Sequence, residues 1–268
     1  MKLSISNIAW PAKYDEEMFG FLSENDFDGL EIAPTRIVPN APYDDLSEAK
    51  RFANRLEEEY GIAISSMQSI WFGIAESIFG SDNDRERLVT YTKKAVNFAC
   101  VVNCPNLVLG CPKNRAVPAG TAPEKYLPIA YDFFNQIGDN AAAYGTCIAI
   151  EPNPPIYNTN FINTTVEAFE ICKTLKNKGI KVNFDIGTFI YNNESIDILK
   201  NNIDLINHVH VSEPYLMPVE KRTLHNKLIN ELRSVGYNKF LSIEMNNPDN
   251  IDLVKKTISY IKEIKYDI

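Results

Sequence analysis

Short apolar runs alternate with longer amphipathic segments from one end of the chain to the other. Each short run is mostly apolar, as expected for a strand of a parallel sheet that is covered on both faces. The predicted strands are Leu3–Ile8, Gly29–Ile32, Ile62–Met67, Asn106–Leu109, Cys147–Glu151, Lys181–Asp185, His208–Val211 and Phe240–Glu244.

The segments between these runs carry apolar residues at spacings of three and four, which is typical of helices with one buried face. In Ser47–Tyr60, for example, Ala49, Phe52 and Leu56 fall on one face while Glu57 points away from it. Each such helix is predicted to connect one strand to the next.

Glycines mark several junctions between a helix and the following strand. Gly61 and Gly179 each follow a helical segment and come shortly before a strand. A left-handed residue often ends a helix at this position, and glycine adopts that conformation without a Cβ clash. We therefore expect left-handed helix caps at both glycines.

Eight strand–helix units in 268 residues predict a single α/β domain, a (β/α)₈ TIM barrel that spans residues 1–268. The alternative is a doubly wound open sheet, which would carry a glycine-rich turn after its first strand. Here Ala9, Trp10 and Pro11 follow Ile8 instead. A closed barrel is favoured.

Composition narrows the function classes. Hydrophobic residues make up 45% of the chain and charged residues 23%, as in an ordinary globular protein. The net charge of −8 disfavours a broad nucleic-acid interface, which needs clustered lysines and arginines. No apolar run approaches the roughly 20 residues of a membrane span, and no secretory signal precedes the first strand. We expect a cytoplasmic protein that binds neither membrane nor nucleic acid.

The five cysteines include no CxxC pair, and their number is odd. Neither a disulfide framework nor a zinc knuckle fits that pattern. Free thiols in a reducing compartment are expected.

Four consecutive late strands end in residues that can bind a metal, namely Glu151, Asp185, His210 and Glu244. In a barrel, functional groups collect where strands end. Each residue alone has an ordinary explanation, such as a helix cap for Asp185 or an ion pair for Glu244. Together, carboxylate oxygens and one imidazole suit Mn²⁺, Mg²⁺, Co²⁺ or Zn²⁺, and a cation would relieve the repulsion among three carboxylates.

These motifs resemble the xylose isomerase-like TIM barrel superfamily over essentially the whole chain. The similar stretches are Ile-Glu-Pro at 150–152, Asn-Phe-Asp-Ile-Gly at 183–187, His-Val-His-Val-Ser at 208–212 and Gly-Tyr-Asn-Lys-Phe-Leu-Ser-Ile-Glu at 236–244. The superfamily includes sugar and sugar-phosphate isomerases, ketose 3-epimerases and endonuclease IV-type nucleases. The resemblance implies that Glu151, Asp185, His210 and Glu244 are metal ligands, and that Glu151 and Glu244 also form an acid–base pair.

The chain departs from the ketose 3-epimerase pattern at two positions. Thr188 stands where that branch has a histidine, and Asn153 begins a segment in which that branch carries a second glutamate. Both differences affect substrate handling, so the resemblance leaves the substrate open. The nuclease branch uses a histidine-rich multi-metal site, and only three histidines in this acidic chain disfavour it.

Further candidates for substrate binding lie in the loops and on the strands around the predicted centre: Glu31, Gln68, Trp71, Lys113, Arg115, Asn153, His208, Glu213 and His225. Trp71 could stack on a sugar or anchor a loop on the barrel rim. Lys113 and Arg115 suit a phosphate or carboxylate, or are solvated loop charges. His225 matches a histidine often found in the superfamily, or is a helix-surface residue.

The sequence thus predicts an enzyme that isomerises or epimerises a small sugar or sugar-phosphate-like carbonyl compound. Its cofactor would be one divalent metal ion, and its chemistry would be proton transfer through an enediolate. A dehydratase or lyase that uses the same enolisation is one alternative. A non-catalytic barrel that binds a sugar derivative is another. The sequence leaves open whether the chain forms a homo-oligomer.

Overall fold

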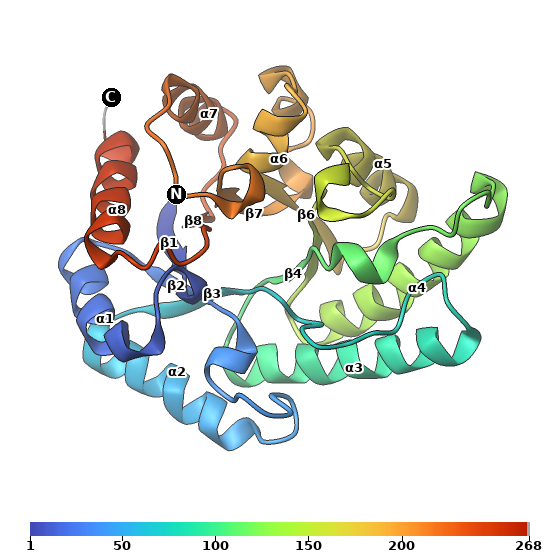
Figure 1. The fold of residues 1–268 in the computed structure, drawn as a ribbon, viewed down its shortest axis with the longest axis horizontal. Coiled ribbons are helices and arrows are strands. Elements are labelled where there is room, and N and C mark those ends of the chain that lie inside the picture. The colour runs from blue at the N-terminus through green and yellow to red at the C-terminus, as the bar shows by residue number, and fades with distance from the viewer. Residues whose placement is uncertain (267–268) are drawn as a thin grey trace.

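In the computed structural model, which describes residues 1–266, eight parallel strands close into a barrel inside a ring of helices (Figure 1). Each strand pairs with the next along the chain, and β8 pairs with β1. The predicted (β/α)₈ barrel is confirmed. The strands are β1 Lys2–Ser6, β2 Gly29–Ile32, β3 Ala63–Met67, β4 Leu107–Leu109, β5 Ile148–Ile150, β6 Ile180–Asp185, β7 Ile206–Val211 and β8 Phe240–Ile243.

A helix follows each strand and covers the outside of the barrel. The helices are α1 Asp15–Glu24, α2 Leu46–Tyr60, α3 Asp82–Val101, α4 Pro123–Ala143, α5 Thr165–Leu175, α6 Ile186–Tyr191, α7 Thr223–Ser234 and α8 Ile251–Tyr266. Short 3-10 turns occupy several loops, including Pro112–Arg115 after β4 and Pro214–Leu216 after β7. None of the helices in the described part of the chain combines the length and apolar character needed to cross a bilayer.

The apolar pattern located every strand to within two residues at each end. The prediction for β2 matches the structure, whereas β7 begins at Ile206, two residues before its predicted start. The first strand ends at Ser6, two residues early, because a 3-10 turn begins at Asn7. These shifts do not change the strand ends at which the predicted metal ligands lie.

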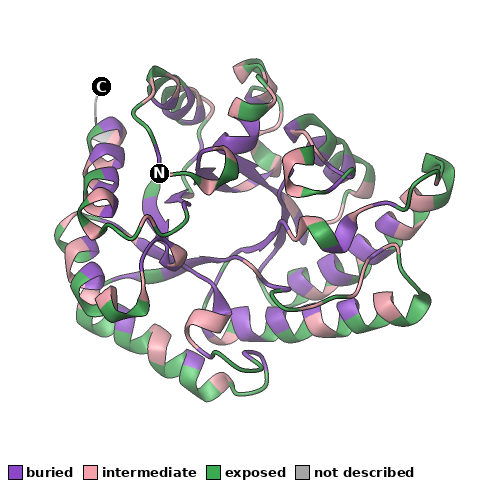
Figure 2. Ribbon diagram, viewed as in Figure 1, coloured by how far each residue is buried: buried purple, intermediate pink, exposed green. Residues whose placement is uncertain are grey.

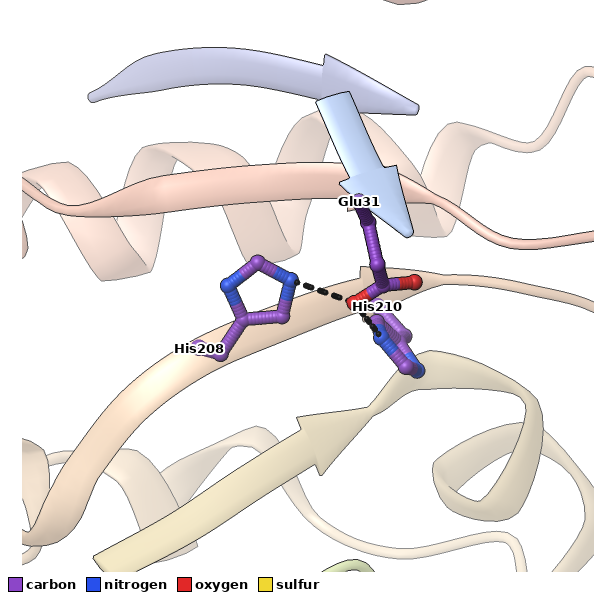
Figure 3. A group of neighbouring side chains, drawn as sticks. All are labelled: Glu31, His208 and His210. Atoms are coloured by element: carbon purple, nitrogen blue, oxygen red, sulfur yellow. Dashed lines mark hydrogen bonds and ion pairs between the residues drawn. The ribbon is translucent and has the colours of Figure 1, made fainter. Parts of the chain in front are cut away.

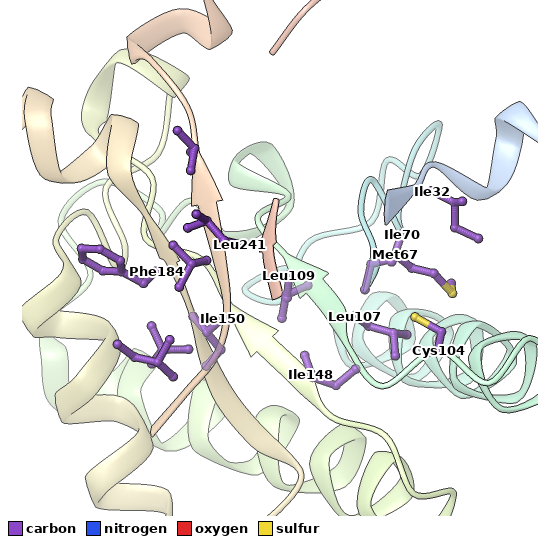
Figure 4. Close-up of a cluster of buried hydrophobic side chains, with 14 of the residues drawn as sticks. Ile32, Met67, Ile70, Cys104, Leu107, Leu109, Ile148, Ile150, Phe184 and Leu241 are labelled. Atoms are coloured by element: carbon purple, nitrogen blue, oxygen red, sulfur yellow. The ribbon is translucent and has the colours of Figure 1, made fainter. Parts of the chain in front are cut away.

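The outer and inner faces of the barrel strands differ in polarity more than the sequence suggested. Apolar residues such as Ile148, Ile150 and Phe184 lie on the outer face and belong to the hydrophobic core (Figure 4). The barrel strands are buried almost throughout (Figure 2). Yet the inner face is polar: the Ser4 and Ser65 hydroxyls, for example, are 2.5 Å apart inside the barrel. Alternate residues of a strand point to opposite faces, so the outer core is apolar while the interior carries chemistry.

Of the two expected glycine caps, one is confirmed and one is wrong. Gly61 ends α2 with φ +69°. At the end of α5, by contrast, Lys176 takes the left-handed position with φ 52°. Gly179 serves a different purpose, since a Cβ there would lie 1.9 Å from the Gly138 carbonyl oxygen. Its lack of a side chain lets the turn before β6 approach α4 closely.

Candidate metal centre

Four side chains from the carboxyl ends of neighbouring strands meet at the top of the barrel. Glu151 directly follows β5, Asp185 ends β6, His210 is the penultimate residue of β7 and Glu244 directly follows β8. One ligand atom from each lies within 4.8 Å of the others. The residues two positions before Asp185, His210 and Glu244 also face the barrel interior, as the period of a strand requires.

His210 lies at the middle of this group. Its Nδ1 is 2.9 Å from Glu151 Oε1 and 3.1 Å from Glu244 Oε2. Asp185 is held by the backbone N–H of Thr188, which donates to Oδ2 at 2.7 Å, and by the hydroxyl of Ser212, which donates to Oδ1. All of these side chains are buried or nearly so, which means that their positions are fixed by packing.

The second nitrogen of His210 faces Glu31, a fully buried residue on β2 (Figure 3). Glu31 Oε2 is 2.9 Å from His210 Nε2 and 3.1 Å from His208 Nε2. A carboxylate that accepts from one ring nitrogen fixes the tautomer and leaves the other nitrogen's lone pair available for a metal. Glu31 and His208 therefore lie beneath the four-residue group, on the side away from the pocket.

The pKa shifts of these buried side chains show that nearby positive charge would stabilise the ionised carboxylates. Burial raises the pKa of Glu244 to about 7, and burial together with the charge of Glu151 raises the pKa of Asp185 to about 6. Burial would lower the pKa of His210, but Glu244 and Glu31 outweigh it and hold that pKa well above its usual value. Burial would raise the pKa of Glu31, yet the two histidines leave it below its usual value.

The donor set and its spacing fit one divalent cation. Three carboxylates and one imidazole are oxygen and nitrogen ligands of the kind that Mn²⁺, Co²⁺, Mg²⁺ and Zn²⁺ accept. Ligands on opposite sides of such an ion are about 4.2 Å apart, twice a bond of about 2.1 Å. The ligand atoms all lie within 4.8 Å of one another, so small side-chain adjustments would complete the shell.

Glu151 is oriented by three further side chains. Asn183 Nδ2 donates to Glu151 Oε1 at 2.7 Å, and Asn153 Nδ2 donates to Oε2 at 3.1 Å. Arg115 in turn donates to Asn153 Oδ1 at 2.6 Å and to the Glu151 carbonyl at 2.7 Å. Gly110 lies against the same carboxylate, and a Cβ there would be 2.7 Å from Oε2.

A pocket of about 530 Å³ opens above the four side chains, and Glu151, Asp185 and Glu244 form part of its wall. Four of the predicted substrate-binding residues also line it, namely Gln68, Trp71, Lys113 and Asn153. Trp71 is almost fully buried, and its Nε1 donates to the Thr92 hydroxyl at 2.9 Å. It therefore anchors the loop after β3 and also lines the pocket.

The remaining candidates lie outside the pocket wall. Arg115 is 1% exposed, and its guanidinium binds backbone carbonyls and Asn153. Glu213 pairs with Arg222 at 2.6 Å, and His225 lies on α7, with Nδ1 3.1 Å from the Tyr260 hydroxyl. None of these placements gives a side chain direct access to a substrate above the centre.

Several residues of the site were not singled out in the sequence. Asn183 and Ser212 each lie two residues from a predicted ligand on the same strand or just after it, so strand periodicity could have indicated them. Phe72, Tyr157 and Leu216 line the pocket from three separate loops. No local signal in the sequence brings those loops together.

A family model described as xylose isomerase-like TIM barrel matches residues 19–264. No curated protein matches the sequence. Similar solved structures include a 3-keto-D-glucoside 4-epimerase from E. coli, with TM-score 0.79, 19% identity and coverage of 98% of this chain and 99% of that one.

Two further solved structures show the same architecture. A D-psicose 3-epimerase from Clostridium cellulolyticum has TM-score 0.77, 14% identity and coverage of 98% of this chain and 96% of that one. The IolI protein with a zinc atom has TM-score 0.74, 18% identity and coverage of 98% and 96%. At such low identities, these similarities show the fold alone.

Proposed function

The chain belongs to the xylose isomerase-like TIM barrel family, and from this membership we propose that it is a divalent-metal-dependent isomerase or epimerase of a small carbohydrate carbonyl compound. The observation that carries the proposal is the convergence of Glu151, Asp185, His210 and Glu244 within 4.8 Å at the floor of a pocket. The names of two similar structures, a keto-glucoside epimerase and a psicose epimerase, support the reaction class.

Glu151, Asp185, His210 and Glu244 would hold the cation, and Glu31 would orient His210 for it. When bound, the cation would supply positive charge that stabilises an oxygen on which negative charge develops. Asn183 and Asn153 would keep the Glu151 carboxylate in place through their amide donors.

Glu151 and Glu244 would act as the acid–base pair. One carboxylate takes a proton from the carbon beside the carbonyl, and the C–H electron pair forms a C=C bond as the carbonyl electrons move onto oxygen. The other glutamate, in its protonated form, returns a proton to the opposite face of that carbon, and the carbonyl re-forms. Alternatively the proton goes to the former carbonyl carbon, while the hydroxyl on the first carbon passes its proton to the neighbouring oxygen and becomes the new carbonyl. The first outcome epimerises the substrate, and the second moves the carbonyl. The two residues follow β5 and β8, so they approach the substrate from different sides of the barrel.

The position of Thr188 argues against a ketohexose handled as in the ketose 3-epimerases. Its hydroxyl donates to the Pro152 carbonyl at 2.9 Å, and the side chain is buried. It therefore cannot replace the histidine that this branch uses. His225 lies away from the centre, and the second group of possible metal ligands among the described residues, Glu31, His208 and His210, shares His210 with the first group.

Solvent-deuterium exchange tests the proposal. The protein would be incubated in D₂O with a panel of keto and aldo sugars and their derivatives, under Mn²⁺, Co²⁺, Mg²⁺ or Zn²⁺ in turn. We expect deuterium at a carbon beside the carbonyl, and its loss in Glu244→Gln and Glu151→Gln. Glu220→Gln, a change of an exposed acid on the loop after β7, is the matched control and keeps the exchange.

Other outcomes would identify the alternatives. A product that has lost water would indicate a dehydratase, since elimination follows the same proton abstraction. A sugar that binds in calorimetry but exchanges no hydrogen under any of the four metals would indicate a binding protein and contradict the proposal.

A further inference from the structure

We infer that the substrate is an unphosphorylated sugar derivative that carries an apolar substituent, such as an aryl or alkyl glycoside with a free keto group on a ring carbon other than the anomeric one. This inference rests on the proposed function, because it places the reacting carbonyl above Glu151 and Glu244. It is carried by three features of the same pocket: its apolar outer wall, its volume and the scarcity of free cations around it.

The pocket has a polar end and an apolar end. The carboxylates come from the sector of β5, β6 and β8, whereas the loop after β3 contributes Trp71, Phe72 and Ile74. Across the mouth, Tyr157 and Leu216 add apolar surface from the loops after β5 and β7. A substrate with its carbonyl among the carboxylates would therefore direct its other end toward aromatic and aliphatic side chains.

Phe72 is held out toward this space by the geometry of its loop. The turn is closed by a hydrogen bond from the Phe72 N–H to the Ser69 carbonyl at 2.9 Å, and both Ser69 and Gly73 have positive φ. Trp71 anchors the same loop against Thr92. The Phe72 ring is left 70% exposed, an unusual position for a large apolar side chain that lines a pocket.

Tyr157 forms the opposite wall and is also fixed. Its hydroxyl accepts a hydrogen bond from the Tyr215 N–H at 2.7 Å, and the centroids of the two rings are 6.3 Å apart. This hydrogen bond fixes the position of the Tyr157 ring in the pocket wall. An apolar substituent would thus lie between Phe72 and Tyr157.

The volume of the pocket exceeds the needs of a simple sugar. A hexose has twelve non-hydrogen atoms, which fill at most about 360 Å³ if each takes the volume of a liquid water molecule. The pocket measures about 530 Å³. The remaining space can hold a substituent of several more atoms.

Side-chain charges do not provide a phosphate site. Among the described residues that line the pocket, Lys113 is the only cation, against the three carboxylates of Glu151, Asp185 and Glu244. One divalent metal and Lys113 would balance those three charges and leave nothing for a dianionic phosphate. Arg115 and Arg222 are nearby in the fold, but their guanidinium groups are already bonded to carbonyls and to Glu213.

Three backbone N–H groups at the expected position of a phosphate site are also already hydrogen-bonded. TIM barrels often bind phosphate at the loops after their seventh and eighth strands. Here the N–H groups of Tyr215, Leu216 and Asn246 in those loops donate to Tyr157, Glu213 and Leu216. These amides are therefore not available to a phosphate oxygen.

The test compares three sugars that share a free keto group on a ring carbon other than the anomeric one, under saturating Mn²⁺: the parent sugar, its phenyl glycoside and its phosphate ester. We expect deuterium exchange with the highest kcat/KM for the phenyl glycoside and the lowest for the phosphate ester. Phe72→Ala should raise KM for the phenyl glycoside about 3- to 10-fold, the effect of losing one aromatic contact, and leave KM for the parent sugar unchanged. Tyr144→Ala, which removes an exposed aromatic at the end of α4 away from the pocket, should change neither.

The outcomes separate this inference from the proposed function. Exchange that is fastest with the phosphate ester, or a phenyl glycoside KM that Phe72→Ala does not move, would overturn the inference and leave the isomerase or epimerase function standing. Exchange with none of the three sugars would count against the function. In that case calorimetry still decides the inference, which requires tighter binding of the phenyl glycoside than of the phosphate ester.

Discussion

Glu31 Oε2 lies 2.9 Å from His210 Nε2, although the two residues are 179 positions apart in the sequence and belong to β2 and β7. The contact crosses the interior of the barrel and ties the proposed metal ligand to a buried carboxylate. His210 then presents Nδ1 to Glu151 and Glu244. The orientation of the ligand ring thus depends on a strand that supplies no ligand itself.

Glu31→Ala should weaken metal binding about 10- to 100-fold, the usual effect of removing a partner that orients a ligating histidine. Isothermal titration with Mn²⁺ or Zn²⁺ measures this change. Glu31→Gln keeps an oxygen that accepts from His210 Nε2, so it should recover much of the affinity. Equal affinity in the wild type and in Glu31→Ala would show that His210 is oriented by other contacts.

Metal affinity should rise with pH between about 5.5 and 8. The pKa of Asp185 is about 6 and that of Glu244 about 7, so both carboxyls hold protons at the acidic end of this range. A cation must displace those protons before it binds, together with the proton of His210, whose pKa is held well above its usual value, and each displaced proton changes the apparent affinity about tenfold per pH unit. Titrations in two buffers of different ionisation enthalpy count the released protons. A pH-independent affinity with no proton release would contradict the assignment of these ligands.

Glu244→Gln should stabilise the protein in the presence of a chelator. The carboxyl has a pKa of 4.5 when unfolded and about 7 when folded, because burial disfavours its charge. The folded state therefore keeps the proton up to a higher pH than the unfolded state does. As a result, the free energy of unfolding falls as pH rises from about 4.5 to 7. Glutamine carries no such charge. The Tm of the Glu244→Gln variant at pH 8 should therefore exceed that of the wild type by at least about 2–4 °C, the shift that 1 kcal/mol produces.

Calorimetry at pH 8 and pH 5 with EDTA checks this expectation. At pH 5 Glu244 is protonated in the folded protein, and the difference between the two proteins should shrink. A Glu244→Gln variant that is less stable than the wild type at pH 8 would show that the ion pair with His210 outweighs the cost of burying the charge.

The convergence of the four proposed ligands could be predicted because it depends on topology alone. Consecutive parallel strands of a barrel end on the same rim, so Glu151, Asp185, His210 and Glu244 had to meet once the strands were located. Asn183 could have been predicted by the same reasoning, since it precedes Asp185 by two positions on one strand. Strand periodicity carries this information without any knowledge of packing.

The loops could not be predicted in the same way. Lys113 and Arg115 flank Asn114 in one turn, and nothing in the local sequence distinguishes the two cations. In the structure Lys113 lines the pocket while Arg115 is buried among the carbonyls of Gly110, Phe161 and Glu151. Those partners come from three separate parts of the chain. Their arrangement is a property of tertiary packing.

Arg115 should therefore matter far more for stability than its neighbour does. Its guanidinium donates to four buried carbonyls and to Asn153 Oδ1, and burial lowers its pKa to about 10, which still keeps it charged at neutral pH. Arg115→Met would leave these acceptors without donors, at about 1–3 kcal/mol for each buried group. We expect the free energy of unfolding to fall by at least about 3 kcal/mol in urea titrations, whereas Lys113→Ala, a loss of one exposed charge, should change it by less than about 0.5 kcal/mol. If the two variants were equally stable, the buried bonds of Arg115 would contribute little to the fold.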